Sequence, residues 1–264
     1  MSNSSLTTEV RGGIAHLALN RPEKRNALDS ATITALSAAL TLCAGDRNVR
    51  VLELTGAGNV FCAGADLAEM HAQVQASEAE NLAHAKKLAK VLGELDAFPK
   101  PTIARVNGDG YGGALGLIAA CDIVVAVDSA KFAFTEVRLG IIPAVVSPFV
   151  LRKIGENAAL RYFLTAELMS SATLQEIGLA HEVVAAAALD STCSRLAENL
   201  LKGAPGALIE AKRLIRDASS ASPAGRAEDS MQMAARLARL RVTEEAQEGF
   251  AAFFAKRTPS WRQD

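Results

Sequence analysis

The sequence predicts an α/β protein with a helical C-terminal region. Over the first two thirds of the 264 residues, segments typical of strands alternate with segments typical of helices, and the rest is typical of helix. Half of the residues are hydrophobic, which is enough for a sizeable core. Five glycines also lie where one apolar strand segment passes into an apolar helix, at Gly108, Gly110, Gly112, Gly113 and Gly116.

The predicted strands are short apolar or alternating runs, a pattern that suits a buried or half-buried pleated surface. They cover residues 14–19, 49–55, 102–106, 123–127, 131–134 and 181–184. Residues 135–148 are predicted to be mostly loop, because Gly140, Pro143 and Pro148 interrupt them.

Four helices carry start signals in the sequence. They are predicted to begin at Asp29, Ser77, Thr173 and Thr243. Ser77 with Glu80, and Thr173 with Glu176, have the spacing of a capping box, in which side chains satisfy unpaired N–H groups. The helix that begins at Thr243 is expected to end at 256–257. Everything after about residue 186 is predicted to be helical, with breaks near 203–205 and 222–223.

Composition argues against several classes of protein. A net charge of −1 gives no sign of nucleic-acid or membrane-surface binding. No apolar run is long enough to span a bilayer, and the N-terminal residues lack the pattern of a signal peptide, so we expect a cytosolic protein. The cysteines and histidines are too widely spaced for a metal site, and we expect free, buried or half-buried thiols. The cysteines are Cys43, Cys62, Cys121 and Cys193.

The glycine-rich stretch at 106–122 has three interpretations. Gly108, Gly110 and Gly113 fit the G-x-G-x-x-G pattern of dinucleotide-binding proteins, with Asp128 at a plausible distance to contact a ribose. Alternatively, unpaired N–H groups at the helix start near Gly113 form part of an oxyanion hole. The third interpretation is a turn that only allows a helix and a strand to pack closely. This stretch alone leaves the three open.

Several runs together resemble the enoyl-CoA hydratase/isomerase (crotonase) family. They are NRPEKRNALD (20–29), FCAGADL (61–67), NGDGYGGALGLIAACD (107–122), FTEVRLGIIP (134–143) and EGFAAFFAKR (248–257). Because these runs are independent and in order, and span nearly the whole chain, they outweigh the single G-x-G-x-x-G match. The resemblance implies a crotonase-like spiral of ββα units over residues 1–200 and a C-terminal helical trimerisation region over 201–264. It also implies an acyl-CoA substrate, no metal or separate cofactor, and a trimer or dimer of trimers.

The resemblance also assigns site residues. The two oxyanion-hole donors of the family fall on the N–H groups of Ala65 and Gly113. Residues at positions that contact coenzyme A in the family are Lys24, Arg25, Ala27, Ala63, Asp66, Leu67, Phe253 and Lys256. In the family the C-terminal contacts often come from a neighbouring subunit. The plainer interpretation of the lysines and arginine is a solvated surface charge.

The sequence departs from the family at one of its two catalytic glutamates. The second glutamate falls on Glu136, but the first is replaced by Gly116, which cannot transfer a proton. Glu136 therefore either hydrates an enoyl thioester alone, or shuttles one proton as an isomerase, or belongs to a protein that binds acyl-CoA with little turnover. As a base, Glu136 requires a partly apolar pocket, for which the candidates are Phe132, Phe134, Ile141 and Ile142. The structural alternative is an ion pair with Arg138 or another cation.

Within the family the chain looks closest to bacterial hydratases of the methylglutaconyl-CoA type, which tolerate glycine at the first glutamate position. Hydration is therefore the first choice over isomerisation. A branched substrate with a second carboxylate requires a cation, for which Arg138, Arg152 and Lys153 are candidates, although surface or interface roles are the plainer interpretation. Asp109 and Tyr111 are interpreted as residues that fill the turn.

Overall fold

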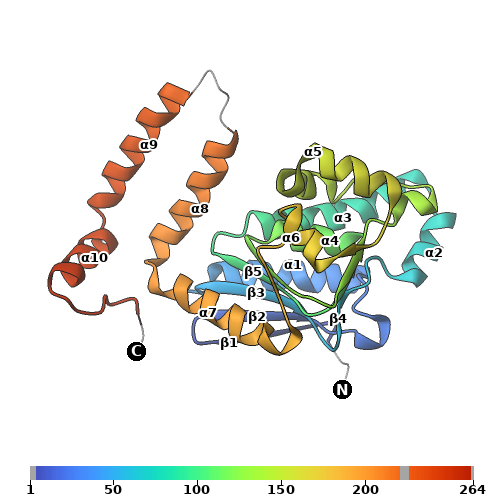
Figure 1. Cartoon of the computed structure of the whole chain (residues 1–264), viewed down its shortest axis with the longest axis horizontal. Coiled ribbons are helices and arrows are strands. Elements are labelled where there is room, and N and C mark those ends of the chain that lie inside the picture. The colour runs from blue at the N-terminus through green and yellow to red at the C-terminus, as the bar shows by residue number, and fades with distance from the viewer. Residues whose placement is uncertain (1–3, 221–225, 263–264) are drawn as a thin grey trace.

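The computed structural model describes residues 4–220 and 226–262, and it contains two β-sheets covered by helices (Figure 1). The larger sheet has the order β1-β2-β3-β5-β7-β10. β1 and β2 form an antiparallel hairpin, and the remaining neighbours in this sheet are parallel. Its strands are β1 (Leu6–Arg11), β2 (Ile14–Leu19), β3 (Val51–Gly56), β5 (Thr102–Val106), β7 (Ile123–Val127) and β10 (Glu182–Val184).

The smaller sheet has the order β4-β6-β8-β9, in which only the pair β8 and β9 is antiparallel. Its strands are β4 (Val60–Cys62), β6 (Asp109–Tyr111), β8 (Lys131–Ala133) and β9 (Met169–Ser170). The stretch predicted as strand, turn and helix therefore contains an additional strand, β6. β4 and β6 have three residues each and lie beside glycine-rich turns, and neither was predicted as a separate strand.

Strands of the two sheets alternate along the chain in a repeated ββα unit. β3, β5 and β7 are neighbours in the large sheet, and each is followed by its partner β4, β6 or β8 in the small sheet. A helix follows each pair, so the chain winds as a spiral. The helices are α1 (Ser30–Gly45), α2 (Leu67–Gln75), α3 (Glu78–Asp96), α4 (Gly113–Ala120), α5 (Ser147–Thr165), α6 (Ser171–Glu176), α7 (Leu189–Lys202), α8 (Pro205–Ser220), α9 (Arg226–Arg241) and α10 (Glu244–Phe254), with short 3-10 helices η1 (Pro22–Lys24), η2 (Glu136–Leu139) and η3 (Ala186–Ala188).

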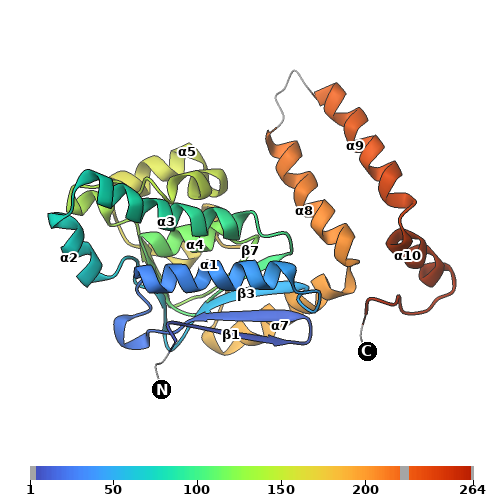
Figure 2. The same cartoon turned by 180° about the vertical axis from the view of Figure 1, so that it is seen from behind.

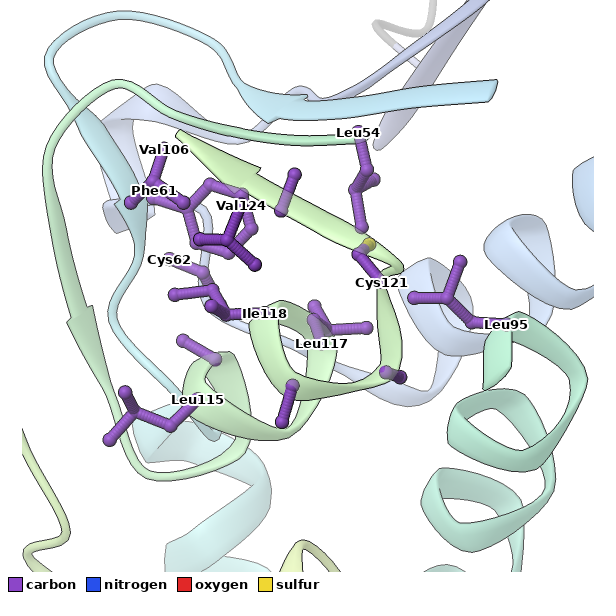
Figure 3. Close-up of a cluster of buried hydrophobic side chains, with 14 of the residues drawn as sticks. Leu54, Phe61, Cys62, Leu95, Val106, Leu115, Leu117, Ile118, Cys121 and Val124 are labelled. Carbon is purple, nitrogen blue, oxygen red and sulfur yellow. The ribbon is translucent and has the colours of Figure 1, made fainter. Parts of the chain in front are cut away.

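Helix α4 lies in the middle of the hydrophobic core. All of its residues from Ala114 to Ala120 are buried. Its side chains pack with Phe61 of β4, Val124 of β7 and Leu95 of α3 (Figure 3). Because α4 is apolar on all sides, it is enclosed by protein, and its N-terminus is held firmly at the edge of the small sheet.

Glycine is required where the turns of successive units touch. A Cβ atom at Gly108, between β5 and β6, would lie 2.1 Å from the carbonyl oxygen of Asn59, between β3 and β4. No side chain can occupy that space. The close contact brings the ends of β4 and β6, and the loops that follow them, to the same edge of the protein.

The three C-terminal helices extend away from the sheets in both views, although Lys212 of α8 forms an ion pair with Asp122 just beyond α4 (Figures 1 and 2). Several of their apolar side chains are exposed, including Phe253 and Phe254, each 77% exposed. The proposed boundary between residues 200 and 201 falls in the last turn of α7 and stays a prediction. So does the trimerising role of this region.

Most of the predicted helix starts are confirmed. Asp29 accepts a hydrogen bond from the N–H of Thr32, Ser77 and Glu80 form a reciprocal capping box, and Thr243 caps α10. The box predicted at Thr173 is wrong, because α6 begins two residues earlier and Ser170 caps it by accepting from the N–H of Thr173. The last helix ends at Phe254 rather than at 256–257.

Two further predictions concern the state of the cysteines and membrane-spanning helices. The four cysteines are all free and buried, as expected. Within residues 4–220 and 226–262, no helix is both long and apolar enough to cross a membrane.

Candidate active site

The loop that joins β4 to α2 leaves one N–H group unused. The N–H of Ala63 donates to the carbonyl of Arg25, that of Gly64 to the sulfur of Cys62, and that of Asp66 to the carbonyl of Leu28. The N–H of Ala65, between them, has no acceptor among the described residues. An unpaired main-chain donor in an ordered loop is available to an incoming oxygen atom.

A second unused donor lies at the start of α4. The N–H of Gly112 donates to the carbonyl of Ala133, and that of Leu115 donates to the carbonyl of Gly112. Gly113 is the first residue of the helix, so its N–H has no partner within α4, and no acceptor for it occurs in the described part of the chain. The positive end of the helix dipole adds to its attraction for negative charge.

The two loops are in direct contact. A Cβ atom built on Gly64 would lie 2.7 Å from the carbonyl oxygen of Tyr111 and 3.9 Å from the amide nitrogen of Gly113. Gly64 also has a φ of +88°, which residues with a side chain rarely adopt. The peptide units on either side of Ala65 and Gly113 are therefore neighbours.

The carboxylate of Glu136 lies against the second loop. A Cβ atom on Gly112 would be 3.1 Å from Oε1 of Glu136. The other oxygen, Oε2, is buried and has no hydrogen-bond partner within the described ranges. No salt bridge to Arg138 or to another described cation occurs, which disfavours the structural ion pair considered from the sequence. Burial raises the pKa of the Glu136 carboxyl above its ordinary value.

The surroundings proposed for Glu136 are only partly buried. Phe132 and Phe134 are buried, and the ring of Phe134 packs edge-on against Phe163 with centroids 4.5 Å apart. Ile141 and Ile142 are 55% and 70% exposed in the single chain. Of the four apolar candidates, only the two phenylalanines are therefore buried within the single chain.

Apolar side chains fill the space around Gly116. A Cβ atom at this position would lie 2.6 Å from Cγ1 of Val146 and 3.0 Å from Cδ1 of Leu92. Both of these side chains are buried. Val146 and Leu92 thus occupy the space where the side chain of the family's first glutamate would begin, and neither can transfer a proton.

Two residues that sequence reasoning missed fix the loop at 20–29 against the first donor loop. The guanidinium of Arg21 forms ion pairs with Asp29 and Asp66 and donates to the carbonyl of Ala27. The buried amide of Asn26 donates to the carbonyls of Ala57 and Val60. The φ of Asn26, +56°, is a left-handed conformation that asparagine tolerates better than most residues.

Asp66, predicted to contact coenzyme A, is fully engaged within the protein. One oxygen caps α2 by accepting from the N–H groups of Ala68 and Glu69, and the other binds Arg21. The guanidinium and N–H donors hold the pKa of this carboxyl below its usual range, against the opposing effect of burial, which is the largest single cause. Asp66 thus holds the loop that carries Ala65.

The other predicted coenzyme A residues lie in two separate places. Lys24, Arg25 and Ala27 lie in the loop beside the first donor loop, and Leu67, 81% exposed, begins α2. Phe253 and Lys256 are at the end of α10 and just beyond it, at the opposite end of the protein from α2 (Figures 1 and 2). One chain therefore does not bring the C-terminal pair to this site.

The cations considered as partners for a second carboxylate of the substrate also lie in different places. Arg152 pairs with Asp96, and Lys153 donates to the carbonyl of Asp122, beyond the C-terminal end of α4. Arg138 lies two residues from Glu136, is exposed, and has no carboxylate partner in the described portion of the chain.

Asp109 has a structural role, as expected. Its carboxylate accepts from Arg25, from the hydroxyl of Tyr111 and from the N–H of Lys131. These contacts tie the loop at 20–29 to the small sheet. Burial, followed by the charge of Asp109, raises the pKa of the Tyr111 phenol.

The topology disfavours the dinucleotide interpretation of Gly108, Gly110 and Gly113. In that motif one strand runs directly into the turn and helix. Here the glycines span β6, which belongs to the other sheet from β5. The N–H of Asp128 donates to the carbonyl of Val184 in the turn after β7.

Replacing Gly64 by alanine is expected to lower kcat/KM for an enoyl-CoA by about a hundredfold, because the added methyl displaces the carbonyl of Tyr111 and moves both donor loops. Steady-state kinetics would measure the loss. Gly155→Ala is a matched control, since Gly155 in α5 also has a positive φ but no atom within 4 Å of a Cβ there. An equal loss in both variants would show that backbone strain alone is responsible.

Comparison with known proteins is consistent with this geometry. A family model described as enoyl-CoA hydratase/isomerase matches residues 9–264. The 2,3-dehydroadipyl-CoA hydratase of Escherichia coli is 34% identical over 98% of this chain and 99% of its own length. The hydroxycinnamoyl-CoA hydratase-lyase of Pseudomonas fluorescens is 35% identical over 79% and 76%. A crystal structure of an enoyl-CoA hydratase from Shewanella pealeana superposes with a TM-score of 0.93 at 37% identity, covering 98% and 97% of the two chains.

The ββα spiral is therefore a crotonase fold, as the sequence predicted. The chain belongs to the enoyl-CoA hydratase/isomerase family.

Proposed function

We propose that this protein is an enoyl-CoA hydratase that uses Glu136 as its only catalytic carboxylate. It adds water across the double bond of an α,β-unsaturated acyl-CoA thioester. The N–H groups of Ala65 and Gly113 bind the thioester oxygen. No cofactor takes part, and coenzyme A enters as part of the substrate.

The residues present can perform each proton transfer in turn. Glu136, as the carboxylate, removes a proton from water while the water oxygen bonds to Cβ of the substrate. The electron pair of the double bond moves to the thioester oxygen, where the two main-chain donors and the dipole of α4 stabilise the negative charge. Glu136 then returns its proton to Cα, which yields a 3-hydroxyacyl-CoA and regenerates the carboxylate.

The observation that carries this proposal is the unpaired, buried oxygen of Glu136 beside Gly112. A buried carboxylate oxygen without a partner costs stability, which argues for a role other than structural. Burial raises the pKa of Glu136, which makes the carboxylate a stronger base than an exposed glutamate.

We further propose a substrate with a second carboxylate, as in the methylglutaconyl-CoA type. Arg138 is the one candidate cation that is close to Glu136 in sequence and has no carboxylate partner among the described residues. The name of the Escherichia coli relative also denotes an acyl group that carries a carboxylate.

The assembly is proposed to be a homo-oligomer, a trimer or a dimer of trimers. Phe253 and Lys256 lie far from the donor loops of their own chain, on a helix whose end exposes two phenylalanines. A neighbouring chain would bring them to the site. Without it, the coenzyme A contacts would be incomplete.

Isomerisation is the second candidate, because one carboxylate can move a proton between Cα and Cγ. The side chains around Gly116 are apolar and carry no charge that would favour hydration over isomerisation or the reverse. The two activities differ in product: the hydratase consumes the conjugated thioester, whereas the isomerase creates it.

An enoyl-CoA panel tests the proposal. We expect loss of enoyl-thioester absorbance with crotonyl-CoA and with 3-methylglutaconyl-CoA, and a 3-hydroxyacyl product by mass.

Arg138→Ala should raise KM for the dicarboxylic thioester by about tenfold and leave that for crotonyl-CoA unchanged. Arg195→Ala, which removes an exposed arginine on α7, is the control. Gain of conjugation from a β,γ-enoyl-CoA with no hydroxy product would establish the isomerase instead.

A further inference from the structure

A cavity lies at the other end of the large sheet from the candidate active site. Its volume is about 680 Å³, within the range of small-ligand pockets. It is formed by the β1–β2 turn, the residues just before β3, the end of α7 and the segment that follows α10. The donor loops follow the opposite ends of the strands, so β3 alone separates the two places by roughly 20 Å.

The lining of this cavity is strongly basic. Its only acidic side chain among the described residues is that of Glu198. The basic side chains are Arg11, Arg47, Arg50, Lys202 and Arg262. No salt bridge pairs any of them with a described carboxylate. The excess of positive over negative side chains in this concave site attracts an anion.

Arg50 is held rigidly at the wall of the cavity. Its guanidinium donates to the main-chain carbonyls of Leu201, Gly203 and Trp261, while its Nε is buried without a partner in the described structure. Carbonyl groups orient the guanidinium but do not neutralise it. Burial lowers the pKa of Arg50, and the negative charge of Glu245 only partly opposes this effect, so a bound anion would stabilise the guanidinium further.

An aromatic ring forms part of the same wall. Trp261 is half-buried, its Nε1 donates to the carbonyl of Lys202, and its own carbonyl accepts from Arg50. The ring also packs near Gly249 of α10. Indole rings anchored in this way offer a flat surface on which a heterocyclic base can stack. The cavity therefore combines positive charge with a stacking surface.

We propose that this cavity binds a nucleoside diphosphate, with the phosphates held by the arginines and the base stacked on Trp261. Arginine is suited to phosphate because its planar donors match two oxygens at once. A simple inorganic anion would use only the basic part of the wall. The ligand would connect the N-terminal hairpin, α7 and the C-terminal segment, which now meet through hydrogen bonds around Arg50.

The same chemistry occurs in a free nucleotide and in the nucleotide end of coenzyme A. Titration with ADP represents the first source, and titration with 3′-phosphoadenosine 5′-diphosphate represents the second. The ligand of higher affinity identifies the source. Pyrophosphate and adenosine, tested separately, are each expected to bind about tenfold or more weakly than the complete nucleotide, because each satisfies only one half of the site.

Tryptophan fluorescence of the full chain is a direct test, because Trp261 is the only tryptophan. We expect saturable quenching by ADP or by its 3′-phosphate. Arg47→Glu should weaken this binding by about tenfold or more. Lys86→Glu makes the same charge change at an exposed position on α3 that does not line the cavity, and it should leave binding unchanged.

Trp261→Phe, followed by calorimetry, separates stacking from folding. Phenylalanine keeps an aromatic face, so binding should weaken only a few-fold, whereas Trp261→Ala should weaken it by about tenfold or more. The proposal is overturned if neither nucleotide gives a saturable response at millimolar concentration. It is equally overturned if Arg47→Glu and Lys86→Glu respond alike, since the nucleotide would then bind elsewhere, including the acyl-CoA site.

Discussion

Replacing Glu136 by glutamine is expected to lower kcat by about 10²- to 10⁴-fold, the range that one general acid–base group contributes. Glutamine keeps the shape of the side chain but neither accepts nor returns a proton. Binding of coenzyme A should be unchanged, because Glu136 contacts the second donor loop at Gly112 and not the loop at 20–29. Turnover of an enoyl-CoA and calorimetric binding of coenzyme A would measure the two quantities.

The pH dependence of the same reaction follows from the raised pKa of Glu136. Hydration begins with the ionised carboxylate, so kcat/KM should fall as the pH decreases through this raised value. The midpoint should lie above the ordinary pKa of a glutamate, 4.5. An acid limb centred at or below that ordinary value would contradict the burial of the catalytic group.

The free energy of unfolding should decrease as the pH rises, whereas kcat/KM should increase. A carboxyl whose folded-state pKa is raised favours folding when protonated, and this contribution is lost as the pH rises through the folded-state value. Glu136→Gln cannot ionise, so its stability relative to the unmodified protein should increase over that pH range. Glu156→Gln on α5 is the control, because Glu156 is exposed and should affect neither activity nor pH profile.

Restoring the family's first glutamate by Gly116→Glu is expected to destabilise the fold severely without raising activity. The space for Cβ is already within 2.6 Å of Val146, and the remaining atoms would carry a charge into the core around α4. Even Gly116→Ala should be unfavourable: overpacking costs about 1–3 kcal/mol, against a gain of about 1 kcal/mol from helix propensity. Chemical denaturation would measure both variants.

A double-mutant cycle tests whether Val146 causes the destabilisation expected for Gly116→Ala. Val146→Ala alone should destabilise the protein by leaving a cavity, but in combination with Gly116→Ala the new methyl partly fills it. The coupling energy should be about 1–3 kcal/mol in favour of the double variant. Strictly additive effects would show that Val146 does not limit position 116. Loss of the first glutamate is therefore expected to be reversible only together with a change at Val146.

The sequence predicted the repeating part of the fold better than its connections. An alternating run predicted β3, apolar runs predicted β5 and β7, and local capping pairs such as Ser77 with Glu80 predicted helix starts. β4 and β6 are too short for a periodic signal, and they exist because their neighbours pair with them. The strand β1 was missed because most of its residues are exposed and polar.

The candidate site was predicted through motifs rather than through contacts. Ala65, Gly113 and Glu136 were inferred from family resemblance, and the free N–H groups and the unpaired carboxylate oxygen are visible only in three dimensions. Arg21, which helps to hold the donor loop in place, was not predicted because its partner Asp66 is distant in sequence. Likewise, nothing near Gly116 in the sequence indicates that Val146 closes its side.

The position of Trp261 has a practical consequence for studies of unfolding. The sole indole fluorophore belongs to the C-terminal segment, while the sheets and α4 contain none. A melting curve followed by emission would record detachment of that segment from Arg50 and Lys202, whereas circular dichroism would record loss of the helices and sheets. Separation of the two curves would thus distinguish local release of the chain end from global denaturation.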